Sequence, residues 1–412
     1  VKAELDSDSL ERFAWALFEL WWQAGARSAA WAFHAMGWLG GDDCVRRLTA
    51  LMRGQWLRDK QHKFTLEGLE VLAAIGTDLA LMHLSSLANK SPVKKAREKA
   101  DEMLEVVADH RQLSREELED RIVPDLGLGP DGTRPLDFGP RQFVLAFDER
   151  LEPRVFEDGR PLARYPRPNA SDDPAKVAEA GKLWKDFKKD AARLVPEQVS
   201  RLERAMAGRR RWTPAQFEQF FCHHPFLAHL SRRLVWAVHH DQRVEGFRLA
   251  EDGTYADWQD DQFELPGDGL VGVAHPLELD QLASWHELFA DYQILQHFPQ
   301  LHRPTYRPDG HNPLPALEQT VGFGPLLALE KRGWQRGQVV GMGLRELTKE
   351  LPDGLTASLR FEPGVLLDIV KESQPQRVTG LFLSGDEPAR FEQLHPVLCS
   401  ELFLDYYGLT GR

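Results

Sequence analysis

"FHAMGWLGGDDCVRRLTALM" (residues 33–52) and "LEVLAAIGTDLALMHLSSLA" (residues 69–88) align with each other at an offset of 36 residues. Apolar residues and one glycine coincide in this alignment: Leu39 with Ile75, Gly40 with Gly76, Val45 with Leu81, Leu48 with Leu84, and Leu51 with Leu87. Each copy has the pattern of an amphipathic helix, a terminating glycine and a second helix with apolar residues three or four positions apart. Such a helical pair cannot bury its apolar face alone, so the pattern predicts stacked copies.

A partial third copy follows in "SPVKKAREKADEMLEVVADH" (residues 91–110), with Pro92 near the expected helix start. One side of this helix carries Ala96, Ala100, Met103, Leu104 and Val107. The three copies resemble HEAT or armadillo repeats in their period and in the positions of their apolar residues and glycines. The resemblance implies an all-α repeat region, which we place at residues 1–123. Unrelated antiparallel helix pairs also produce such a pattern, so this alternative stays open.

An aromatic segment, "FAWALFELWWQAGARSAAWAF" (residues 13–33), precedes the repeat. Its spacing predicts a further amphipathic helix. We expect Trp15, Trp21, Trp22 and Trp31 to lie in the core or between repeats, because aromatic side chains mainly contribute buried area.

The bulk composition limits the class of protein. A chain of 412 residues is long for one hydrophobic core and favours two or three domains. With 42% hydrophobic and 28% charged residues, the composition is typical of a globular protein. We find neither a membrane-spanning run of roughly 20 apolar residues nor a signal peptide, so we expect no membrane association. The chain starts at Val1, which indicates either a trimmed start methionine or, as we favour, a fragment of a longer protein.

Cysteines and net charge bear on the compartment and the partners. Three cysteines stand far apart, at positions 44, 222 and 399, and form neither a zinc-finger nor a disulfide pattern. We therefore expect the reducing cytoplasm. The net charge of −12 argues against broad attraction to phosphate backbones, although a local basic patch is allowed.

A change in composition marks a second region. Glycine and proline punctuate "VPDLGLGPDGTRPLDFGP" (residues 123–140), so we place a connector at residues 124–140. Beyond it, short β-compatible runs with Asp-Gly turns come in blocks separate from helices, which predicts an α+β domain with short antiparallel strands at residues 141–412. The whole chain is therefore expected to have a mixed fold.

Prolines set the expected helix ends in this region. Pro174 and Pro196 each suit a first helical turn, which predicts two helices separated near Val195. Pro225 is expected to break the helix that begins after Thr213. A helix over residues 279–298 is expected to end at Pro299.

The order of segments in the second region is similar to that of a known family. "LVW" (234–236), "FRLAEDGTYAD" (247–257), "AHPLEL" (274–279), "SWHELFADYQILQHFPQLHRPTY" (284–306) and "KRGW" (331–334) resemble the bacterial DUF4132 family. The likeness covers about residues 140–345, and "AHPL" and "FPQLHR" are its most specific parts. The family is a domain of unknown function that includes proteins named molybdate metabolism regulators. The resemblance implies regulation linked to molybdate or molybdopterin, and it assigns no catalytic residue. His297 stands where the family tends to have proline.

The polar stretch "QHFPQLHRPTY" (residues 296–306) is the candidate ligand site. An arginine fork beside two amides suits a carboxylate or phosphate, and chain exits from helices often line clefts. The candidate anion-binding residues are Arg303, Gln300, Gln296, His275, Trp285 and Asp291. The alternative is structural: the stretch ends a helix, and Arg303 or Gln300 caps its exposed carbonyl groups.

Other chemistry has weaker support in the sequence. The basic residues Lys185, Lys189, Arg209, Arg210 and Arg211 could face phosphates as a nucleic-acid strip, or could form a solvated face. The histidines lack a metal-binding spacing, and loops for nucleotides and serine nucleophiles are missing. We therefore expect no cofactor, no metal and no catalytic residue.

We interpret the chain as a non-enzymatic binding or regulatory protein whose helical repeats present a surface to a macromolecular partner, a protein rather than nucleic acid. A small anionic ligand is a further expectation. Two alternatives remain: an enzyme acting on an anionic small substrate near Arg303, and a nucleic-acid-binding transcription regulator.

Overall fold

The computed structural model describes residues 6–25, 29–240, 243–308, 310–337, 339–340, 343–366, 374–385 and 389–410. The chain divides into two compact units, Val1–Asp125 (unit 1) and Leu126–Arg412 (unit 2). Among the described residues, no helix combines the length and the apolar character that crossing a membrane requires.

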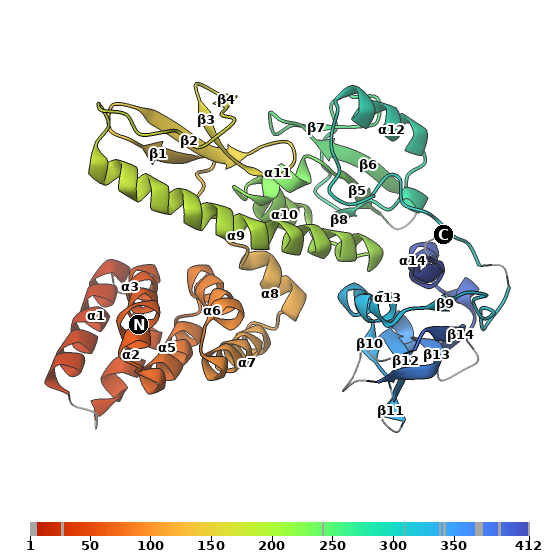
Figure 1. Ribbon diagram of the computed structural model, residues 1–412, viewed down its shortest axis with the longest axis horizontal. Coiled ribbons are helices and arrows are strands. Elements are labelled where there is room, and N and C mark those ends of the chain that lie inside the picture. Colours follow the sequence, from red (N-terminus) through yellow and green to blue (C-terminus); the bar gives the residue numbers. More distant parts are fainter. Residues whose placement is uncertain are drawn as a thin grey trace. The chain divides into compact units, whose positions relative to one another are not determined.

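Unit 1 is helical throughout its described regular structure (Figure 1). Its helices are α1 (Ser7–Ala24), α2 (Trp31–Leu39), α3 (Asp42–Arg53), α4 (Gln55–Arg58), α5 (His62–Ile75), α6 (Asp78–Lys90), α7 (Lys94–His110) and α8 (Arg115–Arg121). Helix α5 packs against α2 and α7, and α6 packs against α7. Ser114 and Glu117 form a capping box at the start of α8.

The aligned apolar positions of the 36-residue repeat lie in the core of unit 1. Val45, Leu48, Leu81 and Leu84 are fully buried. The two glycines differ, because Gly76 adopts the left-handed conformation with a φ of 63° whereas the cap glycine of α2 is extended. The helix pairs are thus present, but their ends are built differently. The assignment to HEAT repeats stays a prediction.

The buried side predicted for the third copy is confirmed, whereas the prediction for the tryptophans holds only in part. On α7, the predicted apolar side is buried, as expected: Ala96, Ala100, Met103, Leu104 and Val107. Trp15 and Trp21 are also buried. The prediction for Trp31 was wrong, because 64% of this residue is exposed. Trp31 is the first residue of α2, whose buried residues begin at Ala32.

Unit 2 begins with an antiparallel sheet of the strands β1 (Arg134–Asp137), β2 (Gln142–Phe147), β3 (Pro153–Glu157) and β4 (Arg160–Pro161), in that order. Strand β1 falls within the residues that we predicted as a connector. Asp158 and Gly159 both have positive φ and join β3 to β4, as the Asp-Gly pair predicts. Helix α9 (Pro174–Ala207) runs along one face of this sheet (Figure 1).

Helix α9 is continuous, so the predicted division near Val195 was wrong. Pro196 lies inside the helix and is exposed. A proline in a helix interior costs about 3 kcal/mol, whereas each fully buried large apolar side chain contributes roughly 1.5–3 kcal/mol. Leu194 and Leu202 are buried on either side of the proline, so packing outweighs the break.

A second antiparallel sheet has the strand order β7-β6-β5-β8. The strands are β5 (Val235–His239), β6 (Val244–Leu249), β7 (Tyr255–Ala256) and β8 (Leu270–Val273). The elements before it are α10 (Pro214–Phe217), the π-helix η2 (Glu218–Cys222) and α11 (Leu227–Ser231), so the chain breaks around Pro225 as predicted. Thr213 caps α10 in a capping box.

Helix α12 (Leu282–Asp291) packs on this sheet and is shorter than predicted. It ends at Asp291, not at Pro299, because Gln293 takes a positive φ of 54° that no helix continues. Trp285 and Phe289 supply its buried face. Residues 296–306 therefore form a separate loop and not a helix exit.

The last sheet has the strand order β10-β12-β13-β14-β9, and β11 pairs with β12. Its strands are β9 (Thr320–Val321), β10 (Gln335–Arg336), β11 (Val339–Val340), β12 (Gly343–Glu350), β13 (Thr356–Leu366) and β14 (Gln376–Ser384). The helices beside it are α13 (Phe323–Ala328), η4 (Leu329–Arg332) and α14 (Pro396–Tyr407). The mixed fold is confirmed in its general form: a helical region followed by a region of antiparallel sheets.

Candidate functional site

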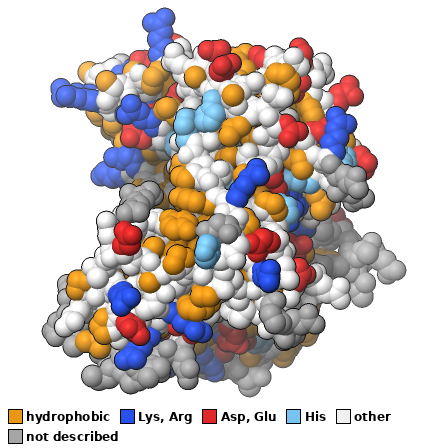
Figure 2. All heavy atoms as spheres, turned by 90° about the vertical axis from the view of Figure 1, so that its right-hand side faces the viewer, with side chains coloured by type: hydrophobic (Ala, Val, Ile, Leu, Met, Phe, Trp, Pro, Cys, Tyr) orange, Lys and Arg blue, Asp and Glu red, His pale blue; other side chains and the backbone are white. Residues whose placement is uncertain are grey.

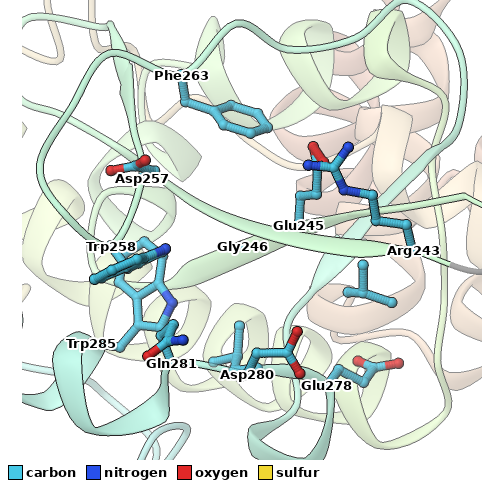
Figure 3. Close-up of a pocket in the computed structure, with 12 residues that line it drawn as sticks. Arg243, Glu245, Gly246, Asp257, Trp258, Phe263, Glu278, Asp280, Gln281 and Trp285 are labelled. Atoms are coloured by element: carbon cyan, nitrogen blue, oxygen red, sulfur yellow. The ribbon is translucent and has the colours of Figure 1, made fainter.

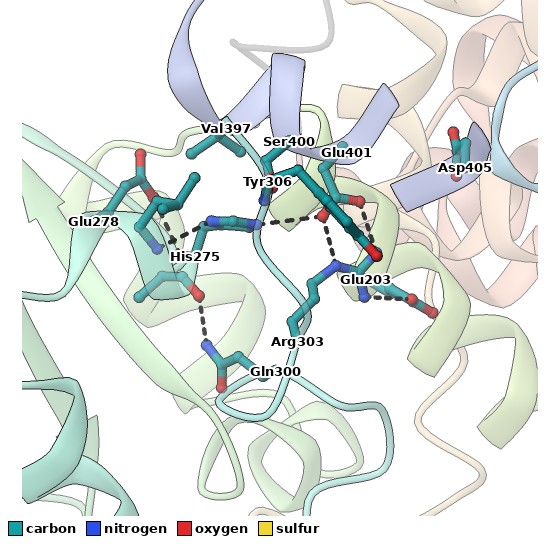
Figure 4. Close-up of polar contacts among 12 residues, drawn as sticks. Glu203, His275, Glu278, Gln300, Arg303, Tyr306, Val397, Ser400, Glu401 and Asp405 are labelled. Carbon is teal, nitrogen blue, oxygen red and sulfur yellow. Dashed lines mark hydrogen bonds and ion pairs between the residues drawn. The ribbon is translucent and has the colours of Figure 1, made fainter. Parts of the chain in front are cut away.

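Arg303 lies at the centre of a buried ion network in unit 2 (Figure 4). Its Nε donates to Oε1 of Glu401 at 2.6 Å, and its Nη2 donates to Oε2 at 2.7 Å. Its Nη1 donates to Glu203 of α9 at 2.7 Å. The guanidinium thus holds one carboxylate with two hydrogen bonds and a second with one, the geometry that arginine forms best.

His275 joins the same carboxylate from the other side. It is fully buried, and its Nε2 lies 3.2 Å from Oε1 of Glu401. Its Nδ1 accepts from the N–H of Leu277 at 3.2 Å, where the short helix η3 (Pro276–Glu278) begins. Because Nδ1 is an acceptor, the ring proton sits on Nε2 and is donated to Glu401.

These donors control the charge of Glu401. Burial raises the pKa of its carboxyl, but the hydrogen bonds from His275 and Arg303 outweigh burial and lower the pKa to about 2. Burial likewise opposes the charge of Arg303, whose pKa is nevertheless raised by its bonds to Glu401 and Glu203. Both groups are therefore held charged in the interior.

The network continues to Asp405, one helical turn beyond Glu401 on α14. Arg332 contacts both carboxylates, with its Nη2 3.2 Å from Oε2 of Glu401 and its Nε bonded to Asp405. Trp334 Nε1 donates to the other oxygen of Asp405 at 2.8 Å. Charges on α9, the 296–306 loop, η4 and α14 are thereby neutralised together.

Gln300 is occupied by main-chain groups. It is fully buried, and its Oε1 accepts from the N–H of Val235 at 2.9 Å. Its Nε2 donates to the carbonyl oxygens of Val235 at 2.6 Å and of Ala274 at 2.8 Å. Gln296 donates to Oε1 of Gln300 at 2.8 Å. The amide side chain therefore joins the loop to the β5–β8 sheet.

The structure brings His275, Gln300 and Arg303 together in the interior of unit 2, where all three are buried. Their donors and acceptors bind groups of the chain itself, so the expected anion site corresponds here to a structural clamp. Trp285 lines a different cavity, and Asp291 is exposed at the end of α12. Anion binding at Arg303 stays a prediction that requires the anion to replace Glu401.

The basic strip divides into two parts. Lys185 and Lys189 are exposed on α9. Arg211 instead donates to Glu278 at 2.9 Å with only 11% of its side chain exposed, and Arg209 Nε lies 3.8 Å from the same carboxylate. Arg210 lies over the ring of Trp212. The arginines thus do not continue the lysine face, because an internal carboxylate holds two of them.

A shallow groove of about 700 Å³ runs along the exposed side of the 296–306 loop. His286, His297 and His302 line it beside apolar side chains. Figure 2 shows how hydrophobic side chains and histidines come to the surface of one face between charged side chains of both signs. Within the part of the chain that the structure describes, no group of three or more His, Cys, Asp or Glu side chains could hold a metal ion.

A separate cavity of about 470 Å³ lies at the edge of the β5–β8 sheet (Figure 3). Gly246 on β6 forms part of its wall, with Trp285 of α12 and Trp258 from the loop after β7. Glu245 and Asp280 provide carboxylates. Aromatic rings beside carboxylates, with a main-chain edge, make a surface suited to binding.

Comparison with known proteins places these features in context. Unit 2 contains three antiparallel sheets and a buried ion network, and residues 159–334 match a family described as "Domain of unknown function (DUF4132)". The chain is also similar to "Uncharacterized protein YehI" of Escherichia coli (strain K12), with 37% identity over 350 residues. The alignment covers 82% of this chain and 29% of that protein, so the chain spans less than a third of its curated relative. No solved structure matches the chain.

The carboxylates of the network and most residues of the cavity were not predicted from the sequence. Glu401 and Asp405 stand four residues apart in the otherwise apolar α14, and this spacing on a buried helix was the available signal. For the cavity, the signal was Gly246 inside a strand, since glycine there often marks a close approach of another group.

Proposed function

We propose that the chain is a non-enzymatic binding or regulatory module whose helical unit docks a protein partner through α1 and α2. The supporting observation is the exposure of four large apolar residues on these helices. The exposed fractions are 57% for Phe13, 67% for Leu20, 64% for Trp31 and 73% for Trp38. Contiguous exposed apolar patches mark protein contact surfaces, in which aromatic residues often carry much of the binding energy.

The spacing of these residues gives each helix one contact side. Phe13 and Leu20 are seven residues apart on α1, as are Trp31 and Trp38 on α2, and seven residues are about two helical turns. Helices α1 and α2 pack against each other. Two adjacent helices with apolar ridges offer a groove for the apolar face of a third, so the proposed partner presents an amphipathic helix.

Further parts of this proposal come from the sequence. We place the helical repeat region at residues 1–123, the connector at 124–140 and the DUF4132-like domain at 141–412. Free thiols at Cys44, Cys222 and Cys399 support a reducing, cytoplasmic location. The proposed regulatory link to molybdate or molybdopterin metabolism rests on the family resemblance.

Site-specific photo-crosslinking in bacterial cells tests the helical surface. A photoreactive phenylalanine analogue replaces Trp38 in the full chain, and the matched control replaces Lys95, which is exposed on α7. We expect a discrete protein adduct at position 38 that is absent at position 95 and decreases in a Trp31→Ser background. Equal adducts at both positions, or adducts only with a second copy of the chain, would contradict the proposal.

A further inference from the structure

Strand β6 has an open edge beside the 470 Å³ cavity. On one side, β5 pairs with β6 from Val244 to Arg248. On the other side, β7 pairs with β6 only at Arg248 and Leu249. Within the described strands, the second side of β6 therefore lacks a partner from Val244 to Phe247. An unpaired edge of this kind is a template for another extended chain.

The hydrogen-bond register shows which main-chain groups face the open side. The N–H of Ala250 donates to the carbonyl oxygen of Thr254 at 2.8 Å, on the side of β7. Main-chain groups two residues apart along a strand face the same side. The N–H and C=O groups of Gly246 and Val244 therefore face the open edge, ready to bond an added strand.

Gly246 allows β6 to lie close to Leu279 and Trp285 on one face of the sheet. A Cβ at this position would lie 2.9 Å from Cδ2 of Leu279 and 3.2 Å from Nε1 of Trp285. Packing against Leu279 is one reason why glycine is needed at position 246. The close approach of Trp285 is a second reason, because a side chain at position 246 would cover the indole N–H.

Only 1% of Trp285 is exposed, and its ring lines the cavity, where the indole N–H is available as a donor. Because Trp285 lines the cavity, an acceptor that enters the cavity would satisfy this donor (Figure 3). The main-chain carbonyl group of a bound peptide is such an acceptor.

Charges at the cavity favour a basic ligand. Glu245 is paired with Arg243, whereas the exposed carboxylate of Asp280 has no ion-pair partner among the described residues. Asp257 accepts only from nearby main-chain N–H groups. The ring of Trp258 is 37% exposed in the same cavity. Free carboxylates beside an open indole suit an ammonium or guanidinium group.

We propose that this cavity binds an extended, basic peptide segment that adds to β6 as a further strand. The peptide bonds Gly246 and Val244 through its main chain and gives a carbonyl oxygen to Trp285. Its lysine or arginine side chain lies between Trp258 and Asp280. This site is separate from the helical surface proposed above, and it assigns a second partner chemistry to unit 2.

The test starts from a displayed library of random peptides selected on the full chain, with counter-selection on Asp280→Lys. Selected peptides are then compared with forms in which lysine or arginine becomes glutamine, and with forms methylated on alternate main-chain nitrogens. Titration calorimetry measures each against the wild type, Asp280→Asn, Trp258→Ala and the control Asp291→Asn, an exposed carboxylate of α12 outside the cavity.

We expect basic peptides whose affinity falls by about tenfold or more with Asp280→Asn or Trp258→Ala, as for a lost charge-assisted contact, and is unchanged with Asp291→Asn. Main-chain methylation is expected to abolish binding. The proposal is overturned if no peptide depends on Asp280, if methylated or glutamine forms bind equally well, or if the cavity instead joins two copies of the chain in sedimentation experiments.

Discussion

Arg303 and Glu401 form a doubly hydrogen-bonded ion pair in the interior of unit 2, with only 2% of each side chain exposed. Removing two charges from water is costly, and a buried pair persists only when good geometry and further hydrogen bonds compensate. Glu203 and His275 supply these further bonds. The pair is thus one part of a hydrogen-bonded network. Removing one partner would leave the other charge buried without compensation and would lower the free energy of unfolding.

Replacing Glu401 by glutamine is expected to lower the free energy of unfolding by about 3–5 kcal/mol, because Arg303 keeps a buried charge without its main partner. Urea denaturation of both proteins measures this loss. The matched control is Glu330→Gln, which breaks the exposed pair with Arg336 at 2.6 Å. Its expected cost is about 1 kcal/mol or less. Equal losses in the two variants would contradict a special role for the buried pair.

The lowered pKa of Glu401 predicts a pH dependence of stability. The folded pKa of about 2 lies below the ordinary value of 4.5, so folding favours the charged carboxylate. Its stabilisation is fully present above about pH 4.5 and is lost as the pH falls toward 2, a contribution on the order of 3 kcal/mol. The stability difference between the wild type and Glu401→Gln should therefore shrink on acidification. A difference that stays constant down to pH 2 would refute this account.

Gln300→Met keeps the side-chain volume but removes the amide. We expect the variant to be less stable, because the N–H of Val235 and the C=O of Ala274 lose their bonds to Gln300, at about 1–3 kcal/mol for each buried group left unpaired. The C=O of Val235 keeps the N–H of Ala274 as a donor at 3.0 Å. Calorimetry measures the loss, and hydrogen exchange at the Val235 amide locates it. Gln296→Met, at the half-buried neighbour, serves as the control with a smaller expected effect. Unchanged exchange at Val235 would contradict the assigned role.

Pro196→Ala should stabilise unit 2, since it restores a main-chain donor inside the continuous α9. The expected gain reaches up to about 3 kcal/mol. Pro174→Ala is the control: Pro174 occupies the first turn of the same helix, where a proline costs little. Thermal unfolding of both variants distinguishes the positions. A stability loss in Pro196→Ala would show that the proline is favourable where it stands.

Local patterns in the sequence predicted much of the fold. The buried face of α7 and the Asp-Gly turn before β4 depend on neighbouring residues, and the structure confirms them. The predictions for Pro196 and Pro299 failed, because a helix end also depends on packing and on the conformation of distant residues. Rules based on neighbouring residues estimate the free-energy cost of a proline in a helix, but they do not include the burial of apolar side chains that offsets this cost.

The site was less predictable for a related reason. Arg303 and Gln300 attracted attention as polar residues near prolines, but their partners lie 98 and 65 positions away, at Glu401 and Val235. Whether an arginine meets a ligand or a carboxylate of its own chain depends on which segments the fold brings together. The sequence alone contains no spacing that decides this.

The position of Glu401 and Asp405 on α14 has a consequence for biosynthesis. During translation, Arg303 leaves the ribosome about a hundred residues before the carboxylate that neutralises it. The interior of unit 2 cannot close around that guanidinium until α14 has emerged, so a nascent chain stalled before Pro396 should remain sensitive to proteases around residues 275–303. Completion of unit 2 therefore waits for the synthesis of α14.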